Sequence, residues 1–414
     1  MNSDMVWPLG KKAAIGILAI SVLVGCVDFI DRLIISSLYP YLKEAYNLTD
    51  TELGLLSGIV NFTVAVLIIP GGYLVDRWSR KKMIAIMMCF WALGSGFSAV
   101  ATTFAGLFAA RFLIGFGEAA YTPATQSLLA ASFPMRWRTT AVTMQQYGAQ
   151  LGSMIGIGLG AFIAARWGWQ HALGIMCIPG LIVGLSALFL HDFPNQPRQE
   201  GQKQASWFSV IKKILTTPSL LCVYLSQSIK LGYTFTLSIW FLTYLTREGG
   251  MSVEKAGTCS VIMLLCSSST LLISGPINDW LRSKSRILSI RVVACLLLTG
   301  LVLSQIALLA LEPGNIAQVA LLIAVPLVCA PLLGLGFALN ADLTRPETRG
   351  TAVSIMTLSM NIIGTGGGPI ILGALSDHFG LSGALTIMSY ALGIAAVLYL
   401  ILSKTYSRDL AKVQ

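Results

Sequence analysis

Long apolar stretches separated by short polar connections run along the whole chain of 414 residues. A helix of about 20 apolar residues spans the hydrocarbon core of a bilayer. The pattern predicts six such helices in the first half, at about 12–39, 52–75, 83–102, 106–131, 138–165 and 169–191. Six more are predicted in the second half, at about 218–246, 253–281, 287–311, 316–342, 349–376 and 382–403. We therefore predict an all-α integral membrane fold with twelve transmembrane helices.

One connection is longer and more polar than the rest. Residues 192–217 hold prolines, glutamines and lysines, and they divide the chain near its middle. We expect residues 1–191 and 218–414 to form two pseudo-symmetric halves of six helices each. The segment between them is predicted to be a cytoplasmic linker.

Two short motifs occur once in each half. The run that begins at Arg138 and reads RTTAV returns at Arg349 as RGTAV. The segment from Gly72 to Lys82 has a weaker copy around Asp279. In so apolar a chain, a duplicated half indicates a transporter built from repeats, with its site between them.

Composition and charge support a membrane protein. The chain is 55% hydrophobic and 11% charged, whereas a typical soluble domain is about 25% charged. Its net charge of +10 could indicate nucleic-acid binding, but the basic residues gather in every second connection. That alternation follows the positive-inside rule. It predicts a multi-pass protein of the bacterial inner membrane with both termini in the cytoplasm, and no nucleic-acid partner.

The sequence contains no recognisable enzyme chemistry. It has no nucleotide-binding loop, no serine nucleophile elbow and no His/Cys metal constellation. Its 8 cysteines lie inside apolar stretches, where cysteine usually serves as a small packing residue. We expect no metal and no cofactor, with a proton gradient as the energy source.

Charged residues within predicted spans carry the candidate chemistry. Each costs about 2.5–3.5 kcal/mol to insert, so it needs a reason. Asp28 and Arg32 are four apart in the first span and share a helix face, so we expect them to pair. Arg111 and Glu118 share a face of the fourth span but lie about 10 Å apart along its axis. Each is therefore expected to find a partner on another helix.

Asp31 and Glu118 are the predicted proton-coupling residues. Burial disfavours the charged form of a carboxylate and a nearby arginine favours it, so a carboxylate under both influences can load and release a proton. The three histidines, His171, His191 and His378, lie away from the middle of the spans. Arg32, beside Asp31, and Arg111, on the face of Glu118, are predicted to balance charge and bind an anion. The alternative is a set of structural ion pairs.

Lys230 in the seventh span has two interpretations. It either snorkels to the nearby interface or faces the cavity as a cation for an anionic head group. Further candidates for substrate binding or charge balance are Asp28, Tyr121, Gln145, Gln146, Tyr147, Gln227, Tyr233, Trp240 and Asn361. For Trp240, an anchor at the membrane interface is the alternative. On the fifth span, Gly148, Gly152, Gly156 and Gly160 lie four apart, which fits either close helix packing or gating movements.

A predicted gating motif lies in the turn between the second and third spans. A carboxylate there can face a helix N-terminus and basic side chains, and so hold the cytoplasmic side in one conformation. The alternative is a solvated basic loop. The residues assigned to the motif and to its copies are Gly72, Asp76, Arg77, Arg80, Lys81, Asp279, Arg138 and Arg349.

These motifs resemble known families. The segment Gly72–Lys82, GYLVDRWSRKK, resembles the signature loop of the major facilitator superfamily. Together with Asp31-Arg32, Leu53–Gly58 and the run from Arg111 to Ala119, it resembles bacterial spinster-like transporters. The Asp-Arg pair and the Gly-Glu-Ala run also resemble organic-anion:proton symporters. The resemblance implies a major facilitator fold, alternating access, and roles in proton coupling for such Asp and Glu residues.

We therefore expect a proton-coupled secondary transporter of an anionic or amphipathic organic solute. The spinster resemblance favours a lysophospholipid or sphingolipid-like substrate, and the alternative is a small organic anion such as a sugar acid or carboxylate. A membrane sensor or a lipid-modifying membrane enzyme is the non-transporter alternative, but the chain offers neither an output domain nor a nucleophile. The expected partners are the substrate, protons and membrane lipids, and the protein is expected to be a monomer.

Overall fold

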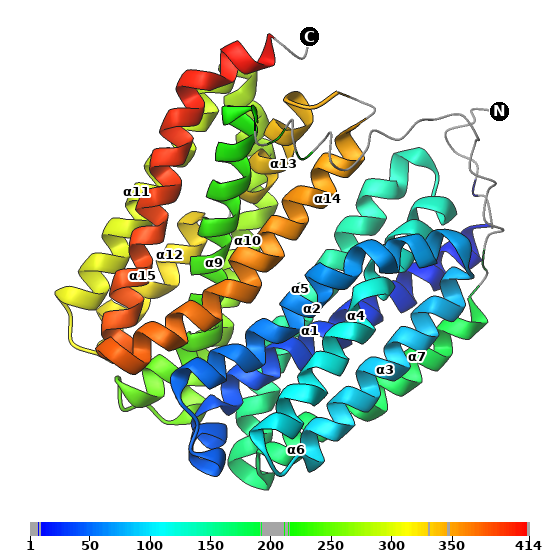
Figure 1. The fold of residues 1–414 in the computed structure, drawn as a ribbon, viewed down its shortest axis with the longest axis vertical. Helices are drawn as coiled ribbons and strands as arrows, with labels where there is room; N and C mark the ends of the chain where they lie inside the picture. Colours follow the sequence, from blue (N-terminus) through cyan, green and yellow to red (C-terminus); the bar gives the residue numbers. More distant parts are fainter. Residues whose placement is uncertain are drawn as a thin grey trace. The chain divides into compact units, whose positions relative to one another are not determined.

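The computed structural model describes residues 7, 10–190, 192, 211, 214, 216–329, 332–345 and 348–411. Within the helices, only the backbone is described at positions 69, 72–73, 75–77, 130, 135–136, 138–139, 271–275, 332–333 and 350. Every regular element in this part of the chain is a helix (Figure 1). The chain divides into two compact units, Met1–Arg198 with Val253–Val261 and Gln199–Ser252 with Ile262–Gln414. Most of the predicted linker at 192–217 lies outside the described residues.

The N-terminal unit contains the first six predicted spans. They are α1 (Lys11–Tyr46), α2 (Asp50–Arg77), α3 (Arg80–Val100), α4 (Phe104–Ser132), α5 (Met135–Trp167) and a sixth formed by α6 (Trp169–Gly174), α7 (Cys177–Ser186) and the short η2 (Ala187–Phe189). Side chains fix where these helices begin. Thr49 and Glu52 form a capping box at the start of α2, and Ser79 and Thr103 cap α3 and α4. Such caps satisfy backbone N–H groups that a helix leaves unpaired, so each chain reversal is short.

The C-terminal unit contains the other six spans, except for Val253–Val261, which belong to the N-terminal unit. They are α9 (Pro218–Arg247), α10 (Val253–Lys284), α11 (Arg286–Leu309), α12 (Ile316–Cys329) with α13 (Leu332–Asp342), α14 (Arg349–Ser359) with the π-helix η4 (Met360–Gly366) and the start of α15, and the rest of α15 (Gly367–Leu410). The backbone of α15 bends at Gly380, where φ is +71°. Glycine adopts this left-handed conformation without steric cost.

The described helices account for the twelve predicted spans. Nine segments in this part of the chain are long and apolar enough to cross a membrane. The last of them, Thr351–Leu410, is two spans joined at the bend of Gly380. The two remaining spans are α9 and α10. Helix α9 is less apolar, and α10 is only partly described. The predicted all-α membrane fold is confirmed.

Glycines bring α1 and α5 into backbone contact within the N-terminal unit. A Cβ added at Gly148 would lie 2.7 Å from the carbonyl oxygen of Val22, and one at Gly152 would overlap the carbonyl of Cys26. The pattern continues one turn further on at Gly156, which faces Ile30. Small residues allow such close approach of helices in lipid. The glycine pattern on the fifth span therefore serves close packing.

The corresponding spans of the C-terminal unit, the seventh and the eleventh, also pack closely. A Cβ added at Gly364 would lie 3.0 Å from the carbonyl oxygen of Ser228, and one at Gly368 would lie 2.7 Å from that of Gly232. The first and fifth spans of each half thus pack backbone against backbone. The duplicated sequence motifs correspond to a duplicated packing arrangement.

Candidate functional site: a buried charge network in the N-terminal unit

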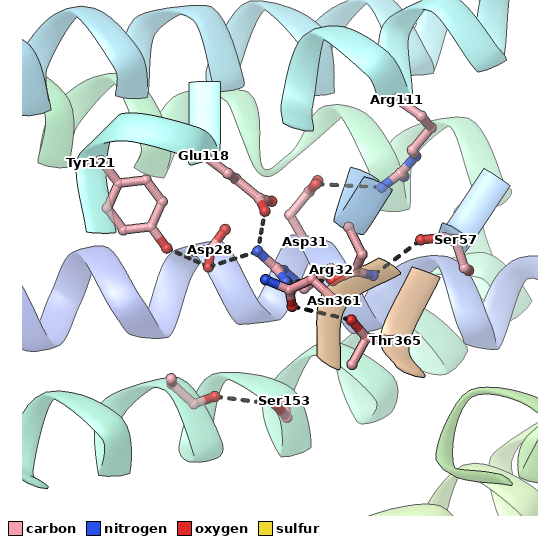
Figure 2. A network of polar contacts seen from close by, with 12 residues as sticks. Asp28, Asp31, Arg32, Ser57, Arg111, Glu118, Tyr121, Ser153, Asn361 and Thr365 are labelled. Carbon is pink, nitrogen blue, oxygen red and sulfur yellow. Dashed lines mark hydrogen bonds and ion pairs between the residues drawn. The ribbon is translucent and has the colours of Figure 1, made fainter. Parts of the chain in front are cut away.

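Helix α1 places three charged side chains in the interior of the N-terminal unit. Asp28 and Asp31 are 1% and 0% exposed, and the side chain of Arg32 is 15% exposed. Because Asp28 and Arg32 are one helical turn apart, Arg32 Nη2 lies 3.9 Å from Asp28 Oδ2. This pairing was predicted from the helical spacing and is confirmed (Figure 2).

Helix α4 supplies two more charges, and the pairs cross between helices. Arg32 Nη2 pairs with Glu118 Oε2, and Arg111 Nη1 lies 3.4 Å from Asp31 Oδ2. Figure 2 shows Glu118 and Asp28 directed at Arg32, with Arg111 directed at Asp31. Arg111 and Glu118 each find a partner on another helix, as expected. Arg111 therefore balances the charge of Asp31, and Arg32 balances the charge of Glu118. Sequence positions alone did not indicate these partners.

Neutral side chains complete the network. The Tyr121 hydroxyl donates to Asp28 Oδ2 at 2.5 Å, and Arg32 Nη1 donates to Asn61 Oδ1 at 2.9 Å. The Ser95 hydroxyl lies 2.9 Å from Asp31 Oδ1 and shares its hydrogen with the Leu173 carbonyl, also at 2.9 Å. Sequence analysis missed Asn61 and Ser95. Both are small polar residues in largely apolar helices that contain other such residues, and nothing in the local sequence distinguishes them from packing residues.

The network holds more acid than base. Asp28, Asp31 and Glu118 face Arg32 and Arg111, so full ionisation would leave one negative charge in excess. Several buried atoms have no hydrogen-bond partner among the described residues, namely Asp28 Oδ1, Glu118 Oε1, Arg32 Nε, Arg111 Nε and Arg111 Nη2. A buried charge without compensation is costly. One bound proton would make the network neutral.

Lys230 is the buried cation of the C-terminal unit. It is 4% exposed, which argues against a side chain that snorkels to the interface. No carboxylate of the described residues lies within 4.0 Å of its ammonium group. Lys230, Thr234 and Ser238 are four apart and share one face of α9. The two hydroxyls donate to carbonyls of their own helix, so their oxygens can still accept hydrogen bonds.

The other predicted binding residues are dispersed over both units. In the N-terminal unit, Gln145 is buried, Tyr147 is half-buried and Gln146 is exposed. In the C-terminal unit, Asn361 accepts a hydrogen bond from Thr365 at 3.3 Å on η4. In the described part of the chain, no hydrogen bond or ion pair joins these four residues to the network of α1 and α4 or to Lys230.

Three predicted residues of α9 take part in helix packing. Gln227 Nε2 donates to the Tyr399 hydroxyl at 3.0 Å, and the Tyr233 hydroxyl donates to Ser304 at 2.9 Å. Trp240 is 0% exposed, which does not fit an anchor at the membrane interface. These side chains join α9 to α15 and α11 or lie in the core, and their role in substrate binding stays a prediction.

The predicted gating motif is only partly described. Only the backbone is described at Gly72, and the side chains of Asp76, Arg77 and Arg138 lie outside the described part of the chain. Beside them, the Ser79 hydroxyl donates to Asp192 Oδ2 at 2.5 Å, and the backbone N–H of Lys81 points to the same oxygen at 3.5 Å. Arg80 is half-buried at the start of α3. Asp192 therefore contacts the N-terminus of α3, where a negative charge is favourable.

In the second copy of the motif, around Asp279, the acid that accepts hydrogen bonds is Asp342. Asp279 is exposed, whereas Asp342, at the end of α13, accepts hydrogen bonds from Arg282 and Tyr406, each at 2.7 Å. Arg349 donates through Nε to the Ala341 carbonyl at 3.1 Å. Sequence analysis chose Asp279 from its alignment with Asp76 and missed Asp342.

An all-helical membrane protein of two six-helix units, with ionisable groups buried inside them, is the architecture of a secondary transporter. The family model of the Major Facilitator Superfamily matches residues 21–311, and the chain belongs to that superfamily. Its members are transporters, so the protein is a transporter and not an enzyme.

Two kinds of transporter are found among the relatives. A probable galactarate/D-glucarate transporter of Bacillus subtilis (strain 168) is 26% identical, over 99% of this chain and 96% of that relative. Protein spinster homolog 1 of Xenopus laevis is 25% identical, over 91% of this chain and 76% of the relative. Among solved structures, a bacterial homolog of the human lysosomal transporter spinster, inward-facing and unoccupied, matches with a TM-score of 0.86 and 19% identity, covering 97% of this chain and 99% of that one. The predicted spinster-like and organic-anion resemblances are confirmed at the level of fold and family.

Proposed function

We propose that the protein is a proton-coupled transporter of an organic anion that works by alternating access in the bacterial inner membrane, with both termini in the cytoplasm. The observation that carries this proposal is the acid excess of the buried network. Three carboxyl groups face two arginines inside the N-terminal unit. Binding one proton neutralises the network and releasing it restores a buried negative charge. Proton occupancy can therefore change which conformation is favoured.

Lys230 is the proposed site for the anion. A buried ammonium group without a carboxylate partner is unfavourable, and a substrate carboxylate or phosphate would compensate its charge. The Thr234 and Ser238 oxygens on the same face of α9 could accept hydrogen bonds from substrate hydroxyl groups. The energy source would be the proton gradient, with no cofactor.

Sugar acids are the first substrate candidates. They combine a carboxylate for Lys230 with hydroxyl groups for Thr234 and Ser238. The alignment with the galactarate/D-glucarate relative is end to end, and a hexuronate transporter of Bacillus subtilis (strain 168) is 25% identical over 92% of both chains. A sphingolipid phosphate is the second candidate, supported by a sphingosine-1-phosphate transporter of Xenopus tropicalis that is 25% identical over 90% of this chain and 75% of the relative. This reverses the order that the sequence motifs favoured.

Transport into proteoliposomes tests the proposal. Purified protein is reconstituted, and uptake of labelled D-glucarate and of sphingosine-1-phosphate is followed with and without an imposed pH gradient, with the membrane potential clamped. We expect D-glucarate to accumulate only with the gradient, and a protonophore to abolish the accumulation. Accumulation that persists with the protonophore would reject proton coupling. Transport of sphingosine-1-phosphate without transport of D-glucarate would select the second substrate.

Two variants separate the proposed roles. Glu118→Gln imitates the protonated acid, so it should still exchange D-glucarate across the membrane but lose gradient-driven accumulation. Lys230→Met should lose both activities because it removes the cation for the substrate. The matched controls are Glu44→Gln and Lys404→Met, which change exposed residues of α1 and α15 and should behave like the unmodified protein. Full accumulation in Glu118→Gln would rule out its role in coupling.

A further inference from the structure

We infer that the coupling proton is shared by Asp28 and Glu118 on either side of Arg32, while Asp31 stays ionised against Arg111. The inference rests on the proposed proton coupling and revises the sequence-based assignment, which paired Asp31 with Glu118. It makes Asp28 a third coupling residue. The inference follows from the different contacts of two groups of residues, the Asp31–Arg111 pair and the two acids around Arg32.

The Asp31 carboxylate is already compensated. Its Oδ2 faces Arg111 at 3.4 Å and its Oδ1 faces the Ser95 hydroxyl at 2.9 Å. Arg111 is 1% exposed, and its Nε and Nη2 have no partner in the described part of the chain. Protonating Asp31 would leave this guanidinium buried without a counter-ion, which is costly. Asp31 and Arg111 are therefore expected to remain a permanent ion pair.

Asp28 and Glu118 share the one remaining cation. Both face Nη2 of Arg32, so two carboxylates would meet a single positive charge. Each has one oxygen engaged and one, Asp28 Oδ1 and Glu118 Oε1, buried without a partner among the described residues. Because both carboxyl groups contact the same nitrogen atom of Arg32, they lie close to each other. Ionised carboxylates can only accept hydrogen bonds, so two of them cannot bond to each other. A proton on either one would supply the missing donor.

Among the residues that the structure describes, Arg32 is the charged residue that pairs with Asp28 and Glu118. The hydrogen bonds that α2 and α3 make with the network come from neutral groups, Asn61 to Arg32 Nη1 and Ser95 to Asp31 Oδ1. Between their terminal charged residues, α2, α3 and α5 carry no Asp, Glu, Lys or Arg in residues 53–75, 83–103 and 139–165. Tyr121 of α4 donates to Asp28 Oδ2 at 2.5 Å. Like-charged carboxyl groups at such short range favour one shared proton.

Infrared difference spectroscopy of the reconstituted protein tests the assignment without any substrate. A protonated carboxylic acid has a C=O stretch that a carboxylate lacks, so a pH titration reports a buried acid that gains or loses a proton. We expect one such band in the unmodified protein and in the control Glu44→Gln. Asp28→Asn and Glu118→Gln should both abolish the band because each leaves one carboxylate for Arg32. Asp31→Asn should keep it.

The outcomes are distinct. A band that persists in Asp28→Asn, or that disappears in Asp31→Asn alone, would overturn the inference, as would the absence of any band in the unmodified protein. If Asp28→Asn does not fold, Tyr121→Phe keeps every carboxyl group and should shift the frequency of the band, because it removes a donor to Asp28. An unshifted band would also overturn the inference. The result is independent of whether D-glucarate is transported, so a wrong substrate assignment would be recognised separately.

Discussion

The two halves of the protein share a packing arrangement and differ in charge. In the N-terminal unit, α1 and α5 meet through glycine, and in the C-terminal unit α9 meets η4 and α15 in the same way. Yet α1 and α4 bury five charged residues, whereas Lys230 is the only charged residue of the seventh span before Arg247. In the tenth span, α12 and α13 carry no charged residue before Asp342.

This difference separates what the fold requires from what the transport function requires. Close contact between the first and fifth spans is common to both repeats, so it is a condition for folding each half. The charges are not common to both, so they are not needed to form a six-helix unit. We expect substitutions at the shared feature to affect both halves alike and substitutions at the charges to affect them differently.

The largest loss of stability is expected at the glycine contacts that both halves share. Gly152→Val and Gly368→Val should each destabilise the protein by about 3 kcal/mol or more, because the new Cβ would overlap the carbonyl of Cys26 or Gly232. The measurement is the yield of monodisperse protein in gel filtration, with its midpoint of thermal unfolding. Gly16→Val is the control, since nothing lies within 4 Å of a Cβ at Gly16. Equal stability of all three variants would show that the glycine contacts are dispensable.

The next largest loss of stability should occur in only one of the two halves when a buried cation is removed from each. Arg111→Met is expected to cost about 3–5 kcal/mol, because it leaves Asp31 buried without its cation. Lys230→Met should be neutral or slightly stabilising, since no carboxylate of the described residues depends on Lys230. Thermal unfolding of both variants in the same detergent gives the comparison. Asp31→Asn added to Arg111→Met should recover much of the lost stability in a double-mutant cycle. A cycle without coupling would contradict the ion pair.

The fold was predictable because its signals are local. Length and hydropathy located α2 and α5 to within a few residues, and the helical repeat placed Asp28 beside Arg32. The π-helix at Met360–Gly366 was not predicted, since it depends on how this segment packs against α9 rather than on its composition. The backbone bend at Gly380 carried only the weak signal of one glycine between two apolar stretches.

The crossed pairs of the site could not be read from the chain. Whether Arg32 meets Asp31 or Glu118 depends on the rotation and axial offset of α1 against α4. No local pattern encodes those quantities. Sequence spacing could exclude a direct contact between Arg111 and Glu118, and that exclusion was correct, but it could not choose the partner.

A smaller effect is expected at the polar support of the charge network. Ser95→Ala removes the hydroxyl that lies 2.9 Å from Asp31 Oδ1, so it should cost about 1–2 kcal/mol, since hydrogen bonds to charged groups are the stronger ones. The loss should be smaller in an Asp31→Asn background. Thermal unfolding of the two single variants and the double variant measures it. Equal losses in both backgrounds would mean that the serine bonds mainly to the Leu173 carbonyl.

The smallest effect is expected at a neutral hydrogen bond of the C-terminal unit. Tyr233→Phe removes the hydroxyl that donates to Ser304, but the Ser304 hydroxyl still donates to the Gly300 carbonyl at 2.9 Å. No buried donor is left without an acceptor, so the loss should be about 1 kcal/mol or less. Thermal unfolding and D-glucarate uptake should both be measured. Near-normal stability with near-normal uptake is the expected result. A strong loss of uptake at unchanged stability would support a role for Tyr233 in substrate binding and would weaken the view that Lys230 is the main substrate contact of the C-terminal unit.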